Sequence, residues 1–430
     1  MTFYEELLTG YNIDLNHSGV SGERIAKRLD EISRIGAEEN NGVTRIGYSR
    51  EEKRAKELVA GWMKEVGLEV SMDGAGNVFG RLEGENKGPA ILSGSHLDSV
   101  PKGGNFDGPL GVLAALEVVE AWRQTGYTPP FPFEVVIFSD EEGSRFNAGM
   151  TGSESFMGKM KSEDLDNLID QEGNTFDEVI KIYDSSREKF LNPSSKEKDI
   201  QLFVEVHIEQ GKVLEKHNQP VGIVSGIAGP AWLEVTFEGQ AGHAGNTSME
   251  NRKDPVIAAG IFVSEIEALP RKVSEMAVAT VGKLKVLPNG VNVIAQEVNL
   301  MVDIRDIREE TRDRLIELIY QKAEEVADKR GIEVTWNLNT KIRPLPIEKN
   351  LQEKLANVMD EMNIEPIYIP SGAGHDSMIV GEEIPVAMLF ARSRDGISHN
   401  PKEWTSLDDC VLSVHVLKKF VEKEMIEKAD

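Results

Sequence analysis

Three short polar runs hold the side chains of this sequence that could do chemistry. Residues 94–99 contain His96 and Asp98, residues 104–108 contain Asp107, and residues 139–143 contain Glu141 and Glu142. The first and third runs each end an apolar, strand-like segment, and all three are rich in glycine or polar residues. Imidazole and carboxylate groups bind borderline divalent metals, and a spare carboxylate can accept a proton from the attacking water. The runs therefore suggest a hydrolytic metal centre.

The spacing within these runs suggests separate roles. Asp98 lies two residues after His96, on the same side of the chain, where it could accept the other ring proton of that histidine. Glu141 and Glu142 are adjacent, and a bend after their strand would let both address one cavity. One could then bind metal while the other moves a proton. The alternatives are a loop of turn-forming residues for Asp107 and a solvated acidic turn for the glutamates.

Two further histidines could complete the site. His207 lies in the alternating, strand-like segment 203–209, and His399 follows residues 396–398 near the last sheet-like region. Each histidine alone is weak evidence, because a lone histidine is more often structural than a ligand. Together with the three runs they supply enough ligands of the right types for two metal ions.

The surrounding pattern predicts an α/β sandwich. Helices are expected from Ser21 and Ser49, the latter opened by a capping box with Glu52, and another from Pro109. Expected strands cover residues 68–72, 77–82, 90–95 and 133–139. Alternating strands and helices are typical of a sheet covered on both faces. Residues 158–200 are polar, and we expect only helices and loops there.

A second domain is predicted within the first. From about residue 226 the pattern becomes strand 232–238, helix 254–269, strands 277–286 and 291–304 around a hairpin turn at 287–290, helix 309–330 and strand 332–338. This order resembles the ferredoxin-like arrangement. The first pattern resumes near residue 343. We therefore expect a domain of residues 227–342 inserted into one made of residues 1–226 and 343–430.

Composition excludes several classes of function. The chain has 430 residues, 40% of them hydrophobic and 28% charged, with a formal net charge of −25. That charge argues against a nucleic-acid or anionic-membrane partner. No stretch approaches the ~18 unbroken apolar residues of a membrane span, and the start lacks the blocks of a signal peptide. The single cysteine, Cys410, excludes an intrachain disulfide. We predict a cytoplasmic protein.

Eight motifs give the chain a family resemblance. They are residues 94–100, 104–111, 140–146, 207–211, 242–245, 291–294, 371–376 and 396–399. In this order, and over nearly the whole chain, they resemble those of the dinuclear metal-dependent amidohydrolases related to aminoacylases and exopeptidases. Within that family the chain looks most like the N-carbamoyl-L-amino-acid hydrolases and allantoate amidohydrolases, with beta-ureidopropionase as a relative.

The resemblance implies a role for each residue of the metal site. Asp107 would bridge two divalent metal ions, with His96 and His207 completing one site and Glu142 and His399 the other. Glu141 would be the general acid and base, and Asp98 would orient His96. Manganese is the usual metal of the family, and zinc, cobalt or nickel can substitute. Histidine at position 207 is informative, because many exopeptidase relatives carry a carboxylate there.

The resemblance also implies a substrate site. Arg305 would bind the substrate carboxylate, for which a planar guanidinium is suited; without the resemblance, a strand-edge salt bridge is the better interpretation. Asn292, Gln210 and the backbone at Gly372 would contact substrate. His243 would stabilise charge on the ureido oxygen from the partner subunit, which implies a homodimer with the inserted domain serving as lid and dimerisation domain. The roles of His375 and Asp376 stay open.

The favoured function is hydrolysis of the ureido bond of an N-carbamoyl-L-amino acid or of allantoate. The enzymatic alternative is a metal aminopeptidase or dipeptidase of the wider family, and the non-enzymatic one is a small-molecule binding protein that kept the fold. A serine or cysteine hydrolase is disfavoured, because no Gly-x-Ser-x-Gly elbow is present and Cys410 lies in an expected C-terminal helix. Residues 73–77 form a turn without the lysine of a phosphate loop.

Overall fold

The computed structural model describes residues 1–192 and 199–427. The chain divides into two compact units. The first comprises Met1–Ser225, Ile347–Ile369 and His375–Asp430, and the second comprises Gly226–Pro346 and Pro370–Gly374. Among the described residues, no helix is both long and apolar enough to cross a membrane.

A large mixed sheet forms the centre of the first unit. Its strands, in spatial order, are β1 (Glu69–Met72), β2 (Val78–Leu82), β4 (Phe133–Phe138), β3 (Ala90–His96), β5 (Ile200–Ile208), β15 (Val386–Ala391) and β6 (Val221–Ile227), with β13 (Leu345–Pro346) and β14 (Tyr368–Ser371) both pairing with β6. The strands β4, β3, β5 and β15 run parallel. Strands β3 and β4 are buried along their whole length, as expected for parallel strands covered on both faces.

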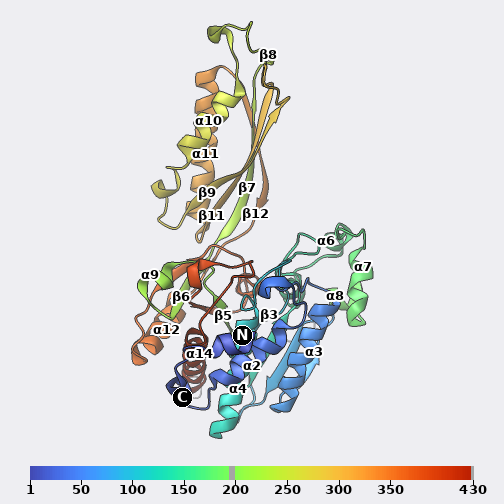
Figure 1. Cartoon of the computed structure of the whole chain (residues 1–430), viewed down its shortest axis with the longest axis vertical. Coiled ribbons are helices and arrows are strands. Elements are labelled where there is room, and N and C mark those ends of the chain that lie inside the picture. Colours follow the sequence, from blue (N-terminus) through green and yellow to red (C-terminus); the bar gives the residue numbers. More distant parts are fainter. Residues whose placement is uncertain (193–198, 428–430) are drawn as a thin grey trace. The chain divides into compact units, whose positions relative to one another are not determined.

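Helices pack around this sheet (Figure 1). The longer ones are α2 (Gly22–Ser33), α3 (Arg50–Glu65), α4 (Pro109–Thr125), α12 (Lys349–Glu361) and α14 (Leu407–Glu427), and the six-residue α1 (Phe3–Leu8) packs on α2. Helix α4 begins with Pro109 and ends at Gly126, whose φ of 71° suits a left-handed helix end. It packs on β3 and is covered in turn by α2 and α14, which explains why its apolar residues surround the whole helix.

The segment that we expected to hold only helices and loops forms a small cluster of its own. It contains α6 (Ser162–Asp166), α7 (Phe176–Val179) and α8 (Arg187–Leu191), and α5 (Thr151–Phe156) directly precedes it. Phe176 and Phe190 are fully buried and meet edge to face at 4.7 Å between ring centroids. Two more short helices of the first unit are α9 (Val213–His217) and α13 (Asp376–Val380). The part of our expectation that concerns residues 193–198 lies outside the described residues.

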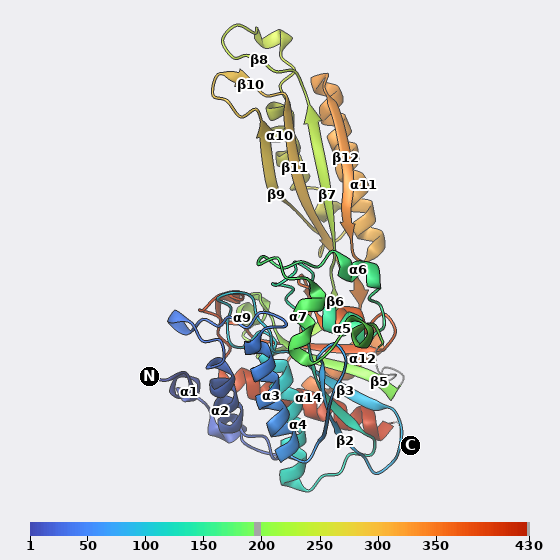
Figure 2. The same ribbon diagram turned by 90° about the vertical axis from the view of Figure 1, so that its right-hand side faces the viewer.

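The second unit is an antiparallel sheet with helices on one face (Figure 2). The strands β12 (Glu333–Lys341), β7 (Gly229–Glu238), β11 (Glu297–Asp306) and β9 (Val278–Leu287) lie in that spatial order, with α10 (Pro255–Ile266) and α11 (Glu309–Arg330) packed on them. Every second residue of β11, beginning at Val298, is buried, which is the signature of a sheet with one covered face.

One expected strand is divided in the structure. The segment 291–304 forms two elements, β10 (Val293–Ile294) and β11, and β10 pairs with β8 (Gly242–His243). The expected tight hairpin at residues 287–290 is therefore wrong in detail. The cause is a pairing between segments about fifty residues apart, which local periodicity does not reveal. The α/β fold class that the sequence predicted is confirmed.

Candidate metal centre

The ends of two parallel strands bring the first side chains together. His96 is the last residue of β3, and His207 is the penultimate residue of β5. Because β3 and β5 are parallel neighbours, their carboxyl ends meet at one edge of the sheet. Asp107 reaches the same place from the loop that leads into α4. Gly108 has a φ of +84°, and a Cβ there would lie 2.5 Å from the His96 ring, so only glycine fits.

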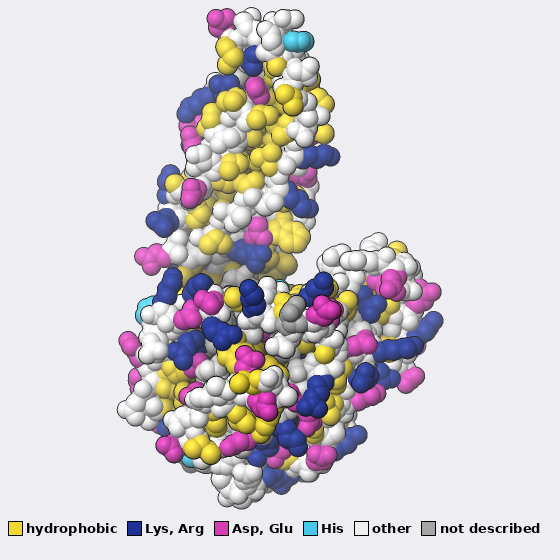
Figure 3. Space-filling model, viewed as in Figure 1, with side chains coloured by type: hydrophobic (Ala, Val, Ile, Leu, Met, Phe, Trp, Pro, Cys, Tyr) yellow, Lys and Arg dark blue, Asp and Glu magenta, His cyan; other side chains and the backbone are white. Residues whose placement is uncertain are grey.

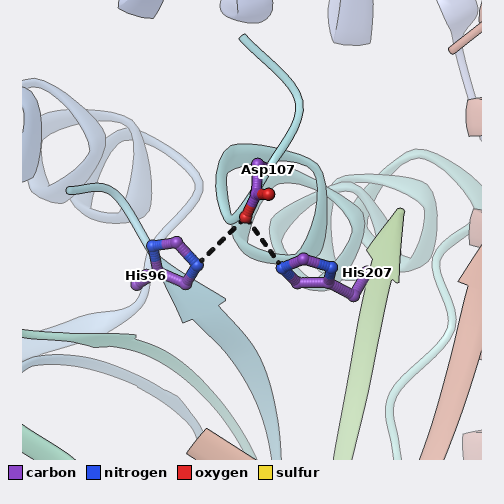
Figure 4. Close-up of side chains that lie close together, drawn as sticks. All are labelled: His96, Asp107 and His207. Atoms are coloured by element: carbon purple, nitrogen blue, oxygen red, sulfur yellow. Dashed lines mark ion pairs between the residues drawn. The ribbon is translucent and has the colours of Figure 1, made fainter. Parts of the chain in front are cut away.

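Asp107 points one carboxylate oxygen at both histidines (Figure 4). Its Oδ1 is 3.1 Å from Nε2 of His207 and 3.6 Å from Nε2 of His96. The exposed fraction is 0% for His96, 1% for His207 and 6% for Asp107. We call these three residues the inner half of the site.

Hydrogen bonds fix the tautomer of both rings. Nδ1 of His96 lies 3.0 Å from the carbonyl oxygen of Asp98, and Nδ1 of His207 lies 3.0 Å from that of Ile208. A carbonyl can only accept, so each Nδ1 carries a proton, and the neutral form of each ring presents the lone pair of its Nε2. Both Nε2 atoms are buried, and neither has a hydrogen-bond partner in the part of the chain that the structure describes. This donor set fits a divalent cation, since metal-bound histidines hold their other ring nitrogen in this way.

A second group of ligands shares Asp107. Nε2 of His399 is 3.3 Å from Oε2 of Glu142 and 3.6 Å from Oδ2 of Asp107. We call Glu142 and His399, with Oδ2 of Asp107, the outer half. The histidine side chain of this half is 49% exposed, and its backbone has a φ of 53°. The structure thus brings all five predicted ligands into two adjacent groups, each with ligand atoms within 4.8 Å of one another.

Asp98 makes contacts that its expected role did not include. Its two carboxylate oxygens accept the backbone N–H groups of Glu141 and Glu142, each at 3.1 Å. Its Oδ1 is 3.5 Å from Nδ1 of His96, a longer contact than the one the ring makes with the Asp98 carbonyl. The carboxylate therefore holds the glutamate loop, while the backbone of the same residue holds the ring. The bend that this loop needs lies at Asp140, whose φ is 52°.

The carboxylates of the site differ in proton affinity. Burial raises the pKa of Glu141 well above its ordinary value, and Glu142 adds to this against the opposing effect of His96. Burial likewise raises the pKa of Glu142, with Asp107 adding to the shift. Burial opposes ionisation of Asp107 as well, but His207 and His96 outweigh it and hold its pKa well below the usual range. Asp107 is thus an anion between two histidines, whereas Glu141 is suited to carry a proton.

Three residues hold the outer oxygen and backbone of Asp107. Oδ2 accepts hydrogen bonds from Nε2 of Gln210 at 2.7 Å and from Oγ of Ser398 at 2.6 Å. Glu403, which is 4% exposed, accepts the backbone N–H groups of Phe106 and Asp107 at 2.8 and 3.1 Å, and it also contacts Ser398. Sequence reasoning placed Gln210 among substrate contacts and missed Ser398 and Glu403. Nothing in the local pattern marks Glu403 as buried.

The sequence assigns no role to His375 and Asp376, and the structure buries both side chains. The His375 ring is buried and meets the His207 ring edge to face at 4.5 Å between centroids. Asp376 is fully buried, and burial together with Glu205 raises its pKa to about 8. His375 therefore packs against the ring of a predicted ligand.

The other expected substrate residues fall into two groups in the second unit. Arg305 donates from Nη1 to the carbonyl oxygen of Gly372 at 2.7 Å. His243 and Asn292 belong to the β8–β10 pair, where Ala244 N–H donates to the Asn292 carbonyl at 3.0 Å. That pair adjoins the start of β11, and Arg305 lies near its end, eight residues or about 27 Å along the strand. One copy of this unit therefore does not bring the two groups together.

Comparisons with known proteins agree with this geometry. The sequence profile of peptidase family M20/M25/M40 matches residues 92–423. The chain is 41% identical to the N-carbamoyl-L-amino acid amidohydrolase of Geobacillus stearothermophilus, over 93% of this chain and 97% of that protein. It is 34% identical to the allantoate amidohydrolase of Escherichia coli, over 92% and 96% of the two chains. Among solved structures, a hydantoinase/carbamoylase family amidase from Burkholderia multivorans matches at 31% identity with a TM-score of 0.87, covering 94% of this chain and 98% of that one.

Proposed function

The chain belongs to peptidase family M20/M25/M40, and on that premise we propose that it hydrolyses the ureido C–N bond of an N-carbamoyl-L-amino acid. The products would be the L-amino acid, ammonia and carbon dioxide. Allantoate is the alternative substrate; the higher identity to the carbamoyl enzyme, 41% against 34%, favours the first. The observation that carries the proposal is the inner half of the site, two buried histidines of fixed tautomer around one shared carboxylate.

The side chains present fit two divalent metal ions. His96, Asp107 and His207 would hold one, and Asp107, Glu142 and His399 the other. Such a pair supplies electrophilic polarisation of the ureido carbonyl and a lowered pKa for the attacking water. We propose manganese as the native metal on the family resemblance, since histidine and carboxylate ligands also accept zinc, cobalt or nickel.

Glu141 would move the proton that hydrolysis requires. Its Oε2 lies 3.7 Å from Nε2 of His96, beside the inner half, and its raised pKa suits a group that both accepts and donates. It would take a proton from the attacking water and deliver it to the departing nitrogen as the C–N bond breaks. Asp98 would hold the Glu141 backbone in place for this transfer, through the hydrogen bond at 3.1 Å.

We also propose that the second unit is a lid and dimerisation domain, and that the enzyme is a homodimer in the cytoplasm. Helix α10 exposes Val256, Ile257 and Ile261 to the extent of 41%, 46% and 36%, and the neighbouring edge strand β9 exposes Leu284. Hydrophobic side chains gather along the visible face of this unit (Figure 3). An apolar helix face beside an unpaired strand edge suits a second copy of the same surface.

The separation of Arg305 from His243 supports the same proposal. A ureido acid is far shorter than the ~27 Å of strand between them, so one substrate molecule cannot contact both in a single copy of the unit. We therefore propose that Arg305 binds the substrate carboxylate in one subunit, while His243 and Asn292 serve the site of the partner subunit, where His243 would stabilise charge on the ureido oxygen.

Ammonia release tests the proposed reaction. Protein loaded with manganese should release ammonia from N-carbamoyl-L-methionine, and it should do so more slowly, or not at all, from allantoate. The same preparation should leave dipeptides intact. Hydrolysis of dipeptides without hydrolysis of either ureido acid would overturn the proposal in favour of a peptidase.

Complementation tests the shared site. Glu141→Gln and His243→Ala variants should each be inactive alone. After the two are mixed, unfolded and refolded together, random pairing should restore about a quarter of the wild-type activity, because half of the dimers would contain one complete site. No recovery would show that His243 acts within its own chain, or not at all. Ile257→Glu should yield monomers on a sizing column, while Ile13→Glu, a matched change at another exposed isoleucine, should not.

A further inference from the structure

Arg305 is held on two sides by neighbouring groups. Its Nε and Nη2 donate to Oδ1 and Oδ2 of Asp303 at 2.8 and 2.9 Å, and its Nη1 donates to Gly372. Asp303 lies two residues earlier on β11, so both side chains share one face of the sheet. That face is opposite to the one packed against α10 and α11, since the alternate residues of β11 form the core.

A tryptophan completes the arrangement. Nε1 of Trp232 donates to Oδ2 of Asp303 at 3.1 Å, and the two residues are direct partners in the β7–β11 register. Oδ2 therefore receives hydrogen bonds from both the indole and the guanidinium. The indole therefore holds the Asp303 carboxylate, and the carboxylate holds the arginine in turn.

These contacts use three of the five N–H groups of the guanidinium. Asp303 uses the edge formed by Nε and Nη2, and Gly372 takes one N–H of Nη1. One N–H on each terminal nitrogen is used by neither partner, so the edge formed by Nη1 and Nη2 keeps at least one donor for a ligand carboxylate. An arginine that is already immobilised loses little conformational entropy when a ligand binds to this edge.

These contacts add little to the stability of the fold itself. Trp232 is 45% exposed, and the side chains of Arg305 and Asp303 are 34% and 28% exposed. Ion pairs with this much solvent contact contribute little to folding. The main effect of these contacts is therefore to fix the position of the Arg305 guanidinium.

We propose that Trp232 and Asp303 are positioning residues that hold Arg305 ready for the carboxylate of the substrate. The proposal rests on the proposed function, in which Arg305 binds that carboxylate. Affinity for the ureido acid would then depend on an indole N–H that has no direct contact with the substrate. Asp303 acts as a support and not as a competitor, because the substrate uses the edge that Asp303 leaves free.

The test compares a ureido acid with its neutral counterpart. We expect Asp303→Asn to raise KM for N-carbamoyl-L-methionine about tenfold and Trp232→Phe about threefold, with kcat within about twofold of wild type. KM for the primary amide, N-carbamoyl-L-methioninamide, should stay unchanged in both variants. Asn299→Ala is the matched control, since Asn299 makes side-chain hydrogen bonds to Glu234 and Thr236 on the same face of the sheet without touching Arg305.

Each other outcome counts against the proposal. Equal increases in KM for acid and amide would show a general structural effect, and a lower KM for the acid in Asp303→Asn would show that Asp303 competes with substrate. If the wild-type protein releases no ammonia from any ureido acid, the proposed function fails separately. Calorimetric titration of the same acid and amide into wild type and Trp232→Phe then decides the matter. A preference for the acid that Trp232→Phe weakens would support the positioning role, and its absence would overturn it.

Discussion

The two halves of the candidate metal centre share Asp107 but are built differently. The inner half stands on the ends of two buried parallel strands, and its histidines are 0% and 1% exposed. The outer half stands on loops after β4 and β15, and the His399 side chain is 49% exposed. Side chains on buried strands are held by packing on all sides, whereas loop residues move more freely. We therefore expect the inner set of proposed ligands to be preorganised and the outer set to adjust when a cation binds.

Hydrogen bonds to Asp107 increase this difference. Within the described residues, its inner oxygen, Oδ1, lies beside the two histidines, whereas Oδ2 already accepts hydrogen bonds from Gln210 and Ser398. A cation in the outer half must share that oxygen with two donors. We therefore expect the inner half to bind metal more tightly and the outer half to exchange it more readily.

Replacing the shared ligand should have the largest effect. Asp107→Asn removes the negative charge from both halves, so we expect it to lower kcat/KM by about 10⁴ and to remove both metal ions. Elemental analysis of the dialysed protein measures the second effect. Loss of only one metal would show that the two halves do not depend equally on Asp107.

Replacing the proton carrier should separate chemistry from metal binding. Glu141→Gln keeps the size and the backbone contact to Asp98, so the metal content should match wild type while kcat falls about 10³-fold. Circular dichroism and elemental analysis serve as controls for folding and loading. A variant with full turnover would remove Glu141 from the mechanism.

A lower pH should weaken the binding of metal by the inner half of the site. Burial disfavours the charged form of His96, but Glu141, Asp107 and Asp98 outweigh it and hold the pKa of His96 well above its ordinary value. The protonated ring must release its proton before a metal can bind, so apparent affinity should rise about tenfold per pH unit below that pKa and level off above it. Because the pKa is raised, the rise should continue above pH 6.5. Calorimetry in buffers of different ionisation enthalpy measures the number of protons released on metal binding. A metal affinity that stays constant between pH 6 and 7.5 would contradict the predicted rise.

Removing the side chain that supports the Asp107 loop should have the smallest effect on metal binding. Glu403→Ala removes the acceptor of two backbone N–H groups and the contact to Ser398, and we expect it to weaken the outer metal about fivefold. Glu403→Gln keeps an acceptor and should stay within about twofold of wild type. Equal effects of alanine and glutamine would show that hydrogen bonding at this position does not matter.

The sequence predicted the fold class and the residue types of the site well. It predicted strand pairing and the hydrogen bonds between distant residues less well. Strand and helix periodicity gave the α/β class, because buried parallel strands read as apolar runs. It missed the break between β10 and β11, since that break depends on pairing with distant His243. It also missed the carboxylate contacts of Asp98 with the glutamate loop and the burial of Glu403, because backbone hydrogen bonds across the chain leave no local pattern.

Anomalous diffraction from crystals soaked with manganese would show which half binds metal first. At low metal concentration we expect one peak, among His96, Asp107 and His207, and at high concentration a second peak among Asp107, Glu142 and His399. A first peak at the outer half, or peaks away from both groups, would contradict this expectation.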